Sequence, residues 1–308
     1  MEEHPPLFIL GLWRTGTTHL HYLMARDSRF GYLKNHQAFT FNFSLLSLDR
    51  LNKVLSIFVP GKRPQDNVRV TLDDPAEEEQ ALCTTTTRSS IHSFFFPQNR
   101  SYFNKYHLFE GVTELEKTEW KETYLNILKN IAFYSKKRKL LLKNPHNTGR
   151  VKELLELFPE AKFIFIHRDP YTVFNSTKKL YDRMISSQFL QSCDEAGIEQ
   201  IILEENAKIM RKYLDERELI PKENLIEIGF SELDGTPMET MKLIYKGLDL
   251  DDFEDAWHSM EAYLDSVKNY RRNTYPSTPR EIRERINSQW GFWIKEFGYS
   301  NSSTIDQK

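Results

Sequence analysis

Residues 7–24 of the chain read LFILGLWRTGTTHLHYLM. Residues 7–10 form an unbroken apolar run, which is typical of a parallel strand that is covered on both faces. Gly11 and Gly16 bracket a short turn, and from Thr17 onward apolar residues recur at helical spacing. The pattern predicts a buried strand, a glycine turn and the first turns of an amphipathic helix, around which the rest of the chain can be placed.

A turn of this kind is suited to binding an anion. Glycines let backbone N–H groups converge, and the start of a helix adds a partial positive charge. Compared with the P-loop pattern G-x-x-x-x-G-K-[ST], the segment keeps both glycines and the final hydroxyl of Thr18 but has Thr17 in place of lysine. Arg14 supplies a charged fork inside the loop instead, so we expect a nucleotide with a shorter anionic tail than a triphosphate. The alternative is a turn with no ligand.

The amino-acid composition excludes several classes of function. The 308 residues carry 42 basic and 44 acidic side chains and a formal net charge of -2, so no global field favours nucleic acid. Cys83 and Cys193 have neither metal-ligand spacing nor the pattern of a disulfide framework. The acidic start MEEHPP and the absence of any apolar run of about 18 residues predict a cytoplasmic protein with no signal peptide and no membrane span.

A second informative block runs from residue 140 to residue 179. It predicts a strand that ends at Lys143, a helix over 151–158, and a strand over 163–166 that is followed by Arg168. In a βαβ unit both cations lie at the carboxyl edge of the sheet, where ligands bind in open α/β folds. Ser176 follows about two turns into the next helix, so Arg168 and Ser176 can together hold a phosphate dianion. Alternatively, Arg168 only pairs with Asp169.

Three further side chains are candidates for acid–base chemistry. His36 follows the loop arginine by 22 positions and can return to the loop, although a lone histidine is more often a surface residue. Glu77 and Glu79 lie in the segment DDPAEEEQALC, which predicts a helix with an aspartate N-cap, Pro75 in its first turn and three glutamates after it. Stabilising the helix start is explanation enough for these glutamates.

Taken in order, L-x-R-T-G-T-T-x-L, L-L-K-N-P-H and I-H-R-D-P-x-x-V-x-x-S resemble three marks of sulfotransferases that use 3′-phosphoadenosine 5′-phosphosulfate (PAPS) and release 3′-phosphoadenosine 5′-phosphate (PAP). The resemblance implies that the loop Arg14, Thr15, Gly16, Thr17 and Thr18 holds the 5′-phosphosulfate. It also implies that Arg168 and Ser176 hold the 3′-phosphate and that Lys143 lies near the bridging oxygen or the acceptor. Arg271 or Arg272 is a further 3′-phosphate candidate, because many members close over the nucleotide with a basic C-terminal segment. No metal is implied.

The expected architecture is a three-layer α/β sandwich with a central, mostly parallel sheet, a P-loop-like nucleotide site, helical insertions and a helical C-terminal half. We expect one domain over 1–308, with an acceptor-pocket insertion at about 33–110 and a helical cap at about 250–308. For the C-terminal half the sequence predicts helices over 199–218, 252–270 and 280–297 and a strand over 225–228.

The resemblance leaves the general base open, because members use histidine or glutamate. Where some members have glutamate shortly after the loop helix, this chain has Asn35 with His36 beside it. The first candidate is therefore His36, followed by Glu77 or Glu79, and the D-x-P-x-E-x-E setting of the two glutamates resembles that of bacterial members.

Aromatic clusters at 39–58 and 94–109 favour an apolar acceptor pocket, and hence a small-molecule hydroxyl acceptor such as a sterol or lipid. The alternatives are a carbohydrate sulfotransferase, a P-loop kinase with a degenerate loop, and a non-catalytic nucleotide-binding protein. The sequence does not fix the oligomeric state.

Overall fold

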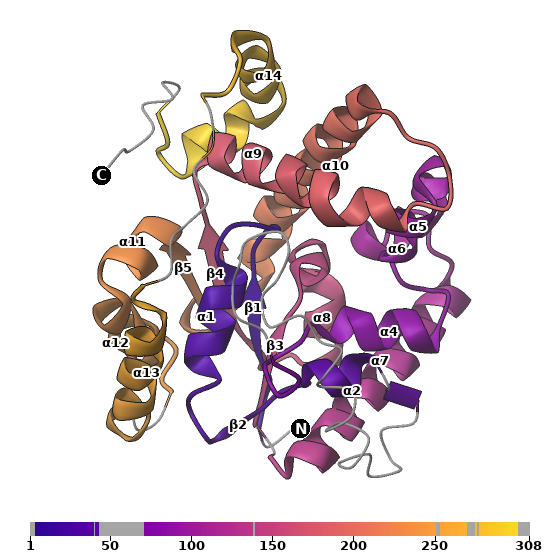
Figure 1. Cartoon of the computed structure of the whole chain (residues 1–308). Coiled ribbons are helices and arrows are strands. Elements are labelled where there is room, and N and C mark those ends of the chain that lie inside the picture. The colour runs from indigo at the N-terminus through magenta and orange to yellow at the C-terminus, as the bar shows by residue number, and fades with distance from the viewer. Residues whose placement is uncertain are drawn as a thin grey trace.

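A computed structural model describes residues 4–39, 41–42, 71–137, 139–250, 253–269, 275 and 277–300. Its centre is a sheet of five parallel strands in the order β2-β3-β1-β4-β5 (Figure 1). The strands are β1 (Leu7–Leu10), β2 (Phe30–Gly31), β3 (Lys139–Lys143), β4 (Lys162–His167) and β5 (Leu225–Gly229). The expected α/β fold with a parallel sheet is therefore confirmed.

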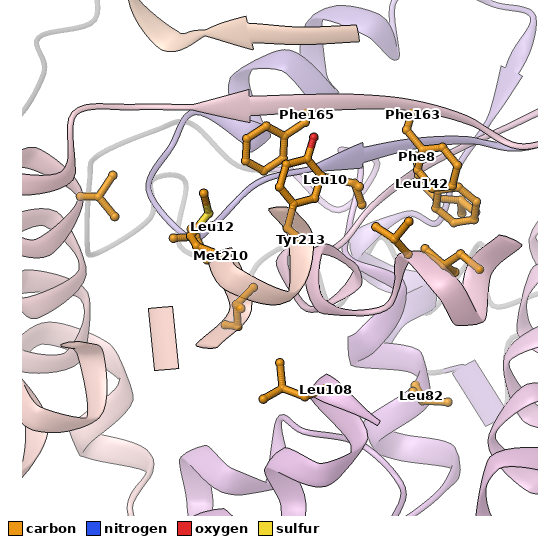
Figure 2. Packing of buried hydrophobic residues seen from close by; sticks show 14 of the residues in the cluster. Phe8, Leu10, Leu12, Leu82, Leu108, Leu142, Phe163, Phe165, Met210 and Tyr213 are labelled. Carbon is orange, nitrogen blue, oxygen red and sulfur yellow. The ribbon is translucent and has the colours of Figure 1, made fainter. Parts of the chain in front are cut away.

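The strands alternate their side chains between two apolar layers, as the two-residue period of a strand requires. Phe8 and Leu10 of β1 belong to one cluster, with Phe163 and Phe165 of β4 (Figure 2). Leu7 and Ile9 point into the other cluster, beside α1 (Thr17–Met24) and α12 (Pro237–Gly247). Both faces are thus buried, which explains why the strands read as continuous apolar runs.

Helices cover the two faces unequally. The face toward Leu7 and Ile9 is covered by α1 (Thr17–Met24), α11 (Phe230–Gly235), α12 (Pro237–Gly247) and α13 (Phe253–Val267). The larger group lies on the other face and around its ends (Figure 1). It comprises α2 (Asn35–Phe39), α4 (Glu78–Thr85), α5 (His92–Phe95), α6 (Arg100–Leu108), α7 (Glu114–Ser135), α8 (Val151–Leu157), α9 (Pro170–Leu180), α10 (Glu195–Glu216) and α14 (Arg280–Glu296).

The strand register brings the predicted site residues to one edge. Ile9 of β1 lies opposite Lys143 of β3, and Leu10 lies opposite Phe165 of β4. The glycine turn, Lys143 and the residues after His167 therefore lie at the carboxyl ends of three adjacent strands. This is the edge at which the sequence predicted a ligand site.

The predicted start of the glutamate helix was wrong. Helix α4 begins at Glu78 with Glu77 in the N-cap position, and neither Asp73 nor Asp74 caps it. Pro75 instead forms an isolated bridge with Lys34, which holds the segment before α4 in an extended conformation. The pairing of Pro75 with Lys34 therefore moves the helix start to Glu78, away from the aspartates that local residue preferences favour as caps.

The sequence also predicts a helix over 119–134, from apolar residues that recur at helical spacing, but α7 begins earlier, at Glu114. The side chains of Thr113 and Glu116 form a capping box, which adds a turn before the apolar stripe. The apolar stripe of this helix consists of Trp120, Tyr124, Ile127, Leu128 and Ile131, and all five residues are buried, as their helical spacing predicts.

Candidate active site

The glycine turn after β1 is shaped by two close contacts. Gly11 has φ 144°, and a Cβ there would lie 2.6 Å from the carbonyl oxygen of Ile166. Gly16 has φ 103°, and a Cβ there would lie 2.3 Å from the ring of Phe230. Both positions therefore require glycine, which explains the two glycines of the motif.

The turn leads into α1 without a side-chain cap at its start. The N–H of Leu20 is bonded to the carbonyl of Gly16, so helical bonding begins there. The N–H groups of the preceding turn, from Thr17 and Thr18, point out of the helix end, as they do in every helix. This end of α1 can therefore donate hydrogen bonds to an anion.

Arg14 connects the turn to the next strand end. Its backbone is in the left-handed region, with φ 71°, and its Nε donates to Oγ of Ser176 at 2.8 Å. Arg168 Nη1 donates to the carbonyl of Arg14 at 3.1 Å. The hydroxyl of Tyr275 also donates to Ser176 Oγ at 2.8 Å. The structure thus brings together Arg14, Arg168 and Ser176, which the sequence assigned to two separate anion sites.

Thr15 has a different position from its neighbours in the loop. The residue is buried, its hydroxyl donates to the carbonyl of Leu12 at 2.8 Å, and its N–H donates to the same carbonyl. Both polar groups of Thr15 are therefore used inside the turn. Its side chain shapes the loop rather than facing a ligand.

Phe230, the first residue of α11, lies against the same edge of the sheet. The guanidinium of Arg168 stacks over its ring at 4.1 Å from the ring centre. Asp169 caps α9 by accepting from the N–H of Thr172 at 2.8 Å and from its hydroxyl at 2.7 Å. The helix start thus uses the Asp169 oxygen that the sequence allowed as a partner for Arg168.

Lys143 lies at the end of β3, and its ammonium forms an ion pair with Glu77. The lysine side chain is only 5% exposed, whereas the Glu77 side chain is 23% exposed. Glu77 therefore has one oxygen beside the cation at the strand end, and its side chain is partly exposed. The sequence named both residues but did not predict that they pair.

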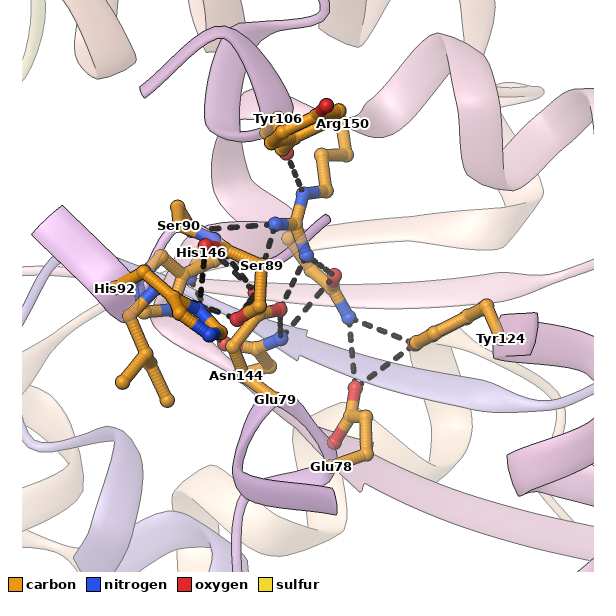
Figure 3. A network of polar contacts seen from close by, with 12 residues as sticks. Glu78, Glu79, Ser89, Ser90, His92, Tyr106, Tyr124, Asn144, His146 and Arg150 are labelled. Carbon is orange, nitrogen blue, oxygen red and sulfur yellow. Dashed lines mark hydrogen bonds and ion pairs between the residues drawn. The ribbon is translucent and has the colours of Figure 1, made fainter. Parts of the chain in front are cut away.

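Glu79 is not available at the site. Its carboxylate is fully buried, is ion-paired with Arg150, and accepts from the hydroxyl of Ser89 at 2.7 Å and from Asn144 at 2.9 Å (Figure 3). Burial alone would raise its pKa, but the Arg150 guanidinium outweighs burial and holds it well below the ordinary value. Glu79 is an ionised structural carboxylate.

Glu78 shows the opposite behaviour. Its Oε1 accepts from the hydroxyl of Tyr124 at 2.9 Å and from Nδ2 of Asn147 at 2.7 Å (Figure 3). No cation is within ion-pair distance of Glu78 in the described part of the chain. Burial, reinforced by the charges of Glu79 and Glu77, raises its pKa to about 7.

The network of Figure 3 continues into the glycine turn. A 3₁₀ turn, η4 (Pro145–Gly149), follows β3 and carries Asn147 and Thr148. Oγ1 of Thr148 accepts from the N–H of Gly11 at 2.9 Å. The buried glutamates are therefore linked through η4 to the first glycine of the loop. The polar run that follows the buried strand β3 is the sequence signal for this link.

His36 lies on α2, and Nδ1 of its ring is 2.9 Å from the carbonyl of Leu72 and 4.0 Å from the carboxylate of Asp73. Its imidazole thus faces the segment that leads to Glu77. Arg271 and Arg272 lie outside the described residues.

Another histidine, His146, was not singled out from the sequence. Its ring packs edge-on against Trp13 of the loop at 4.7 Å, and Nδ1 is 3.0 Å from Oδ1 of Asn144. Burial lowers its pKa to about 4. His146 is neutral near pH 7 and packs against the loop beside Phe94.

The described residues contain no group of three or more histidine, cysteine, aspartate or glutamate side chains placed to hold a metal ion. None of their helices has the length and apolar character needed to cross a membrane.

Comparison with known proteins gives consistent matches. A model of the sulfotransferase family matches residues 5–255. The omega-hydroxy-beta-dihydromenaquinone-9 sulfotransferase Stf3 of Mycobacterium bovis is 31% identical over 295 residues, which cover 96% of this chain and 75% of that protein. The Stf3 protein of Mycobacterium tuberculosis matches equally.

Two solved structures resemble the fold. Sulfotransferase STF9 from Mycobacterium avium has a TM-score of 0.72 at 21% identity, with 96% of this chain and 78% of that chain covered. Sulfotransferase STF1 from Mycobacterium tuberculosis H37Rv has a TM-score of 0.66 at 18% identity, and the match covers 92% of this chain and 77% of that chain. At these identities the two structures support the fold alone.

Proposed function

Because the chain belongs to the sulfotransferase family, we propose that it transfers a sulfonyl group from PAPS to the hydroxyl of an apolar small molecule. The observation that carries the proposal is the meeting of Arg14, Arg168 and Ser176 at the glycine turn, with the Lys143–Glu77 pair at the adjacent strand end. The cluster of Arg14, Arg168 and Ser176 suits the binding of a nucleotide that has two anionic ends. The Lys143–Glu77 pair suits the transfer of the sulfonyl group.

The donor would be held from both ends. The N–H groups at the start of α1 and the loop backbone would bind the 5′-phosphosulfate, which has no γ-phosphate for a P-loop lysine to reach. Arg168 and Ser176 would bind the 3′-phosphate, because a guanidinium and a hydroxyl can share its oxygens. Arg14, bonded to Ser176, lies where these two groups meet.

The transfer requires charge stabilisation and removal of a proton. The acceptor oxygen attacks sulfur, the bond from sulfur to the bridging oxygen breaks, and that oxygen leaves with PAP as negative charge grows on it. Lys143 and the loop N–H groups would stabilise this charge. Glu77 would take the hydroxyl proton, since its side chain is partly exposed and its carboxylate lies beside Lys143.

The other two base candidates are less suited to this role. Glu79 is buried and ion-paired with Arg150, so no acceptor hydroxyl can reach it without breaking the network of Figure 3. His36 turns Nδ1 toward the carbonyl of Leu72, so only Nε2 of its ring could receive a proton from an acceptor. We therefore assign the base to Glu77 and keep His36 as the alternative.

Two observations support an apolar acceptor. The named relative Stf3 acts on a menaquinone-derived lipid that carries a hydroxyl. In this chain Phe94, from the aromatic cluster at 94–109, packs against Trp13 of the loop at 6.0 Å. Apolar side chains thus lie beside the donor site. The cluster at 39–58 lies largely outside the described residues, and the insertion at 33–110 stays a prediction.

The test is transfer of labelled sulfonyl group from PAPS to a panel of isoprenoid alcohols, sterols, phenols and glycans. We expect activity on the long-chain apolar alcohols. Activity on glycans alone would support a carbohydrate sulfotransferase and contradict the apolar acceptor. Binding of PAP without transfer to any acceptor would support a non-catalytic protein, and magnesium-dependent turnover of ATP would support a kinase.

A further inference from the structure

An open hollow of about 780 Å³ lies beside β2, the edge strand of the sheet, and we call it the edge hollow. It is lined by the residues after α1, by residues 30–34, by the C-terminal end of α7 and by one face of α13. Figure 1 shows β2 at the lower end of the sheet with α13 and α7 on either side.

The edge hollow is separate from the donor site. The donor site lies at the first residue of α1, whereas the hollow begins at Ala25, just after the last residue of that helix. Eight helical residues span about 12 Å. Strand β2 pairs with Lys139 and Leu140 at the start of β3, and Lys143 lies at the other end of β3. Donor binding therefore does not account for the hollow.

Three cations line the edge hollow, namely Arg26, Lys34 and Lys137. Among its described lining residues only Asp27 carries a carboxylate, and Arg29 holds that carboxylate through bonds of 2.6 and 2.9 Å. Lys34 also forms an ion pair with Asp73, but both side chains are exposed, so this pair contributes little to stability. The hollow therefore offers excess positive charge to a ligand.

The hollow also contains hydroxyl groups, of which Ser266 already donates to the carbonyl of Tyr263 at 2.6 Å and Tyr263 lies 3.3 Å from Nδ1 of His19. The face that α13 turns toward it contains Ser259, Ala262, Tyr263 and Ser266, and therefore no carboxylate. On the opposite wall, the hydroxyl oxygen of Tyr134 is buried and has no hydrogen-bond partner among the described residues. Cations combined with hydroxyl donors suit the oxygens of a phosphate ester.

An apolar side chain projects beside this polar hollow. Phe133, in the last turn of α7, is 72% exposed, and Tyr134 next to it lines the hollow. Lys129, one turn earlier on α7, and Lys136, just after its end, are exposed as well. An exposed aromatic ring among lysines is suited to an anionic lipid surface, where the ring enters the interface and the cations meet headgroups.

We infer that the edge hollow and Phe133 dock the enzyme on an anionic lipid surface, with a phosphate headgroup bound by Arg26, Lys34 and Lys137. The inference rests on the proposed function, because an apolar alcohol acceptor would itself reside in such a surface. Lys34 lines the hollow and forms a bridge with Pro75, two residues before Glu77. The docked face thus continues into the segment that carries the proposed base.

Vesicle binding of the full chain tests the inference. We expect sedimentation with vesicles of phosphatidylcholine and phosphatidylglycerol, but not with phosphatidylcholine alone, and we expect binding to weaken as salt is added. Lys137→Gln should weaken it about fivefold, as expected for one cation near an anionic surface. Phe133→Ser should weaken it at least about tenfold.

Matched control variants lie on α12. Leu243 is 56% exposed and Lys246 is exposed, and neither lines the hollow. Leu243→Ser and Lys246→Gln should bind vesicles like the unmodified protein. Equal losses in the control and test variants, or no preference for phosphatidylglycerol, would overturn the inference. Tight binding of soluble glycerol 3-phosphate without vesicle binding would also overturn it, because the hollow would then serve a free phosphate ester.

Kinetics separate this inference from the proposed function. With an acceptor embedded in vesicles, Lys137→Gln and Phe133→Ser should raise KM by the factor that they lose in binding. With a short-chain soluble acceptor, both variants should keep their kcat and their affinity for PAP. Failure of all transfer would contradict the proposed function and leave the vesicle result to decide the docking. Intact transfer from vesicles in both variants would contradict the docking alone.

Discussion

Three consecutive glutamates occupy three different environments at the start of α4. Glu77 pairs with Lys143 and is partly exposed, Glu78 is buried against Tyr124 and Asn147, and Glu79 is buried against Arg150. Of the three, only Glu77 is partly exposed. Glu77 is the extended N-cap residue, whereas Glu78 and Glu79 are helical neighbours that point about 100° apart, so three identical side chains reach three different sets of partners.

At this scale the sequence named candidate bases but did not distinguish between the two glutamates. It named Glu77 and Glu79 as equal candidates, since both fit the same spacing. Arg150 distinguishes them, because its guanidinium neutralises Glu79 across 71 residues of sequence. A partner at that separation leaves no local pattern.

The role of Glu77 can be tested by Glu77→Gln, which keeps the shape and removes the basic oxygen. We expect kcat to fall roughly a hundredfold to ten-thousandfold, the usual contribution of a general base. Affinity for PAP, measured by calorimetry, should stay unchanged. His36→Gln is the matched comparison and should lower kcat by a smaller factor than Glu77→Gln does. Full activity of Glu77→Gln would remove the residue from the mechanism.

Glu78 should make stability depend on pH. Its pKa of about 7 in the folded protein is above the ordinary 4.5. Its contribution to stability is therefore full below about pH 4.5 and is lost as pH rises through about 7. We expect the advantage of the unmodified protein over Glu78→Gln to shrink across this range by up to roughly 3 kcal/mol. Urea unfolding at several pH values measures it, and a constant difference would contradict a protonated Glu78.

The glycine turn and η4 act as one element of the site. Thr148 in η4 accepts from the N–H of Gly11, and Gly16 makes room for the ring of Phe230. The sequence predicted the turn itself because strand, glycines and helix are adjacent in the chain. It did not predict η4 or Phe230 as supports, because these come from residues far away in sequence.

Gly16→Ala should disturb this element. The new methyl group would meet the ring of Phe230, and alanine is strained at φ 103°. We expect a loss of roughly 1–3 kcal/mol in stability together with weaker PAP binding. Gly291→Ala is the control, because a Cβ added there in α14 would meet no described residue within 4 Å beyond its own helix backbone, and it should stabilise by up to about 1 kcal/mol. Unimpaired PAP binding in Gly16→Ala would contradict the assigned loop.

Thr148→Val should show whether η4 positions the loop. The substitution keeps the shape and leaves the Gly11 N–H without its acceptor. We expect PAP affinity to fall by about tenfold while the fold is retained, since an orphaned buried donor costs about 1–3 kcal/mol. Calorimetry with PAP and circular dichroism measure the two effects. An unchanged affinity would confine Thr148 to a purely structural role.

At the scale of the whole molecule, the C-terminal region returns to the site. Tyr275 donates to Ser176, and the hydroxyl of Tyr299 lies 2.6 Å from Nδ1 of His167, whose ring stacks on Phe297 at 4.2 Å. These contacts join residues more than 90 positions apart. Periodicity predicted α14 closely but gave no information on where it packs.

The parallel sheet was the most predictable feature, because apolar runs, helices and strand-end cations follow one another in order. Strand order and register then bring the ends of β1, β3 and β4 together. Sequence order alone places these ends on one edge but does not show that Arg14 touches Ser176 or that Lys143 pairs with Glu77.

The central claim is that one nucleotide with two anionic ends binds across the glycine turn and Arg168. Calorimetric titration of the protein with PAP and, separately, with adenosine 5′-monophosphate tests it most directly. The account predicts that PAP binds roughly tenfold to hundredfold more tightly, because the 3′-phosphate gains charged hydrogen bonds to Arg168 and Ser176. Equal affinities, or no binding of PAP, would contradict the account.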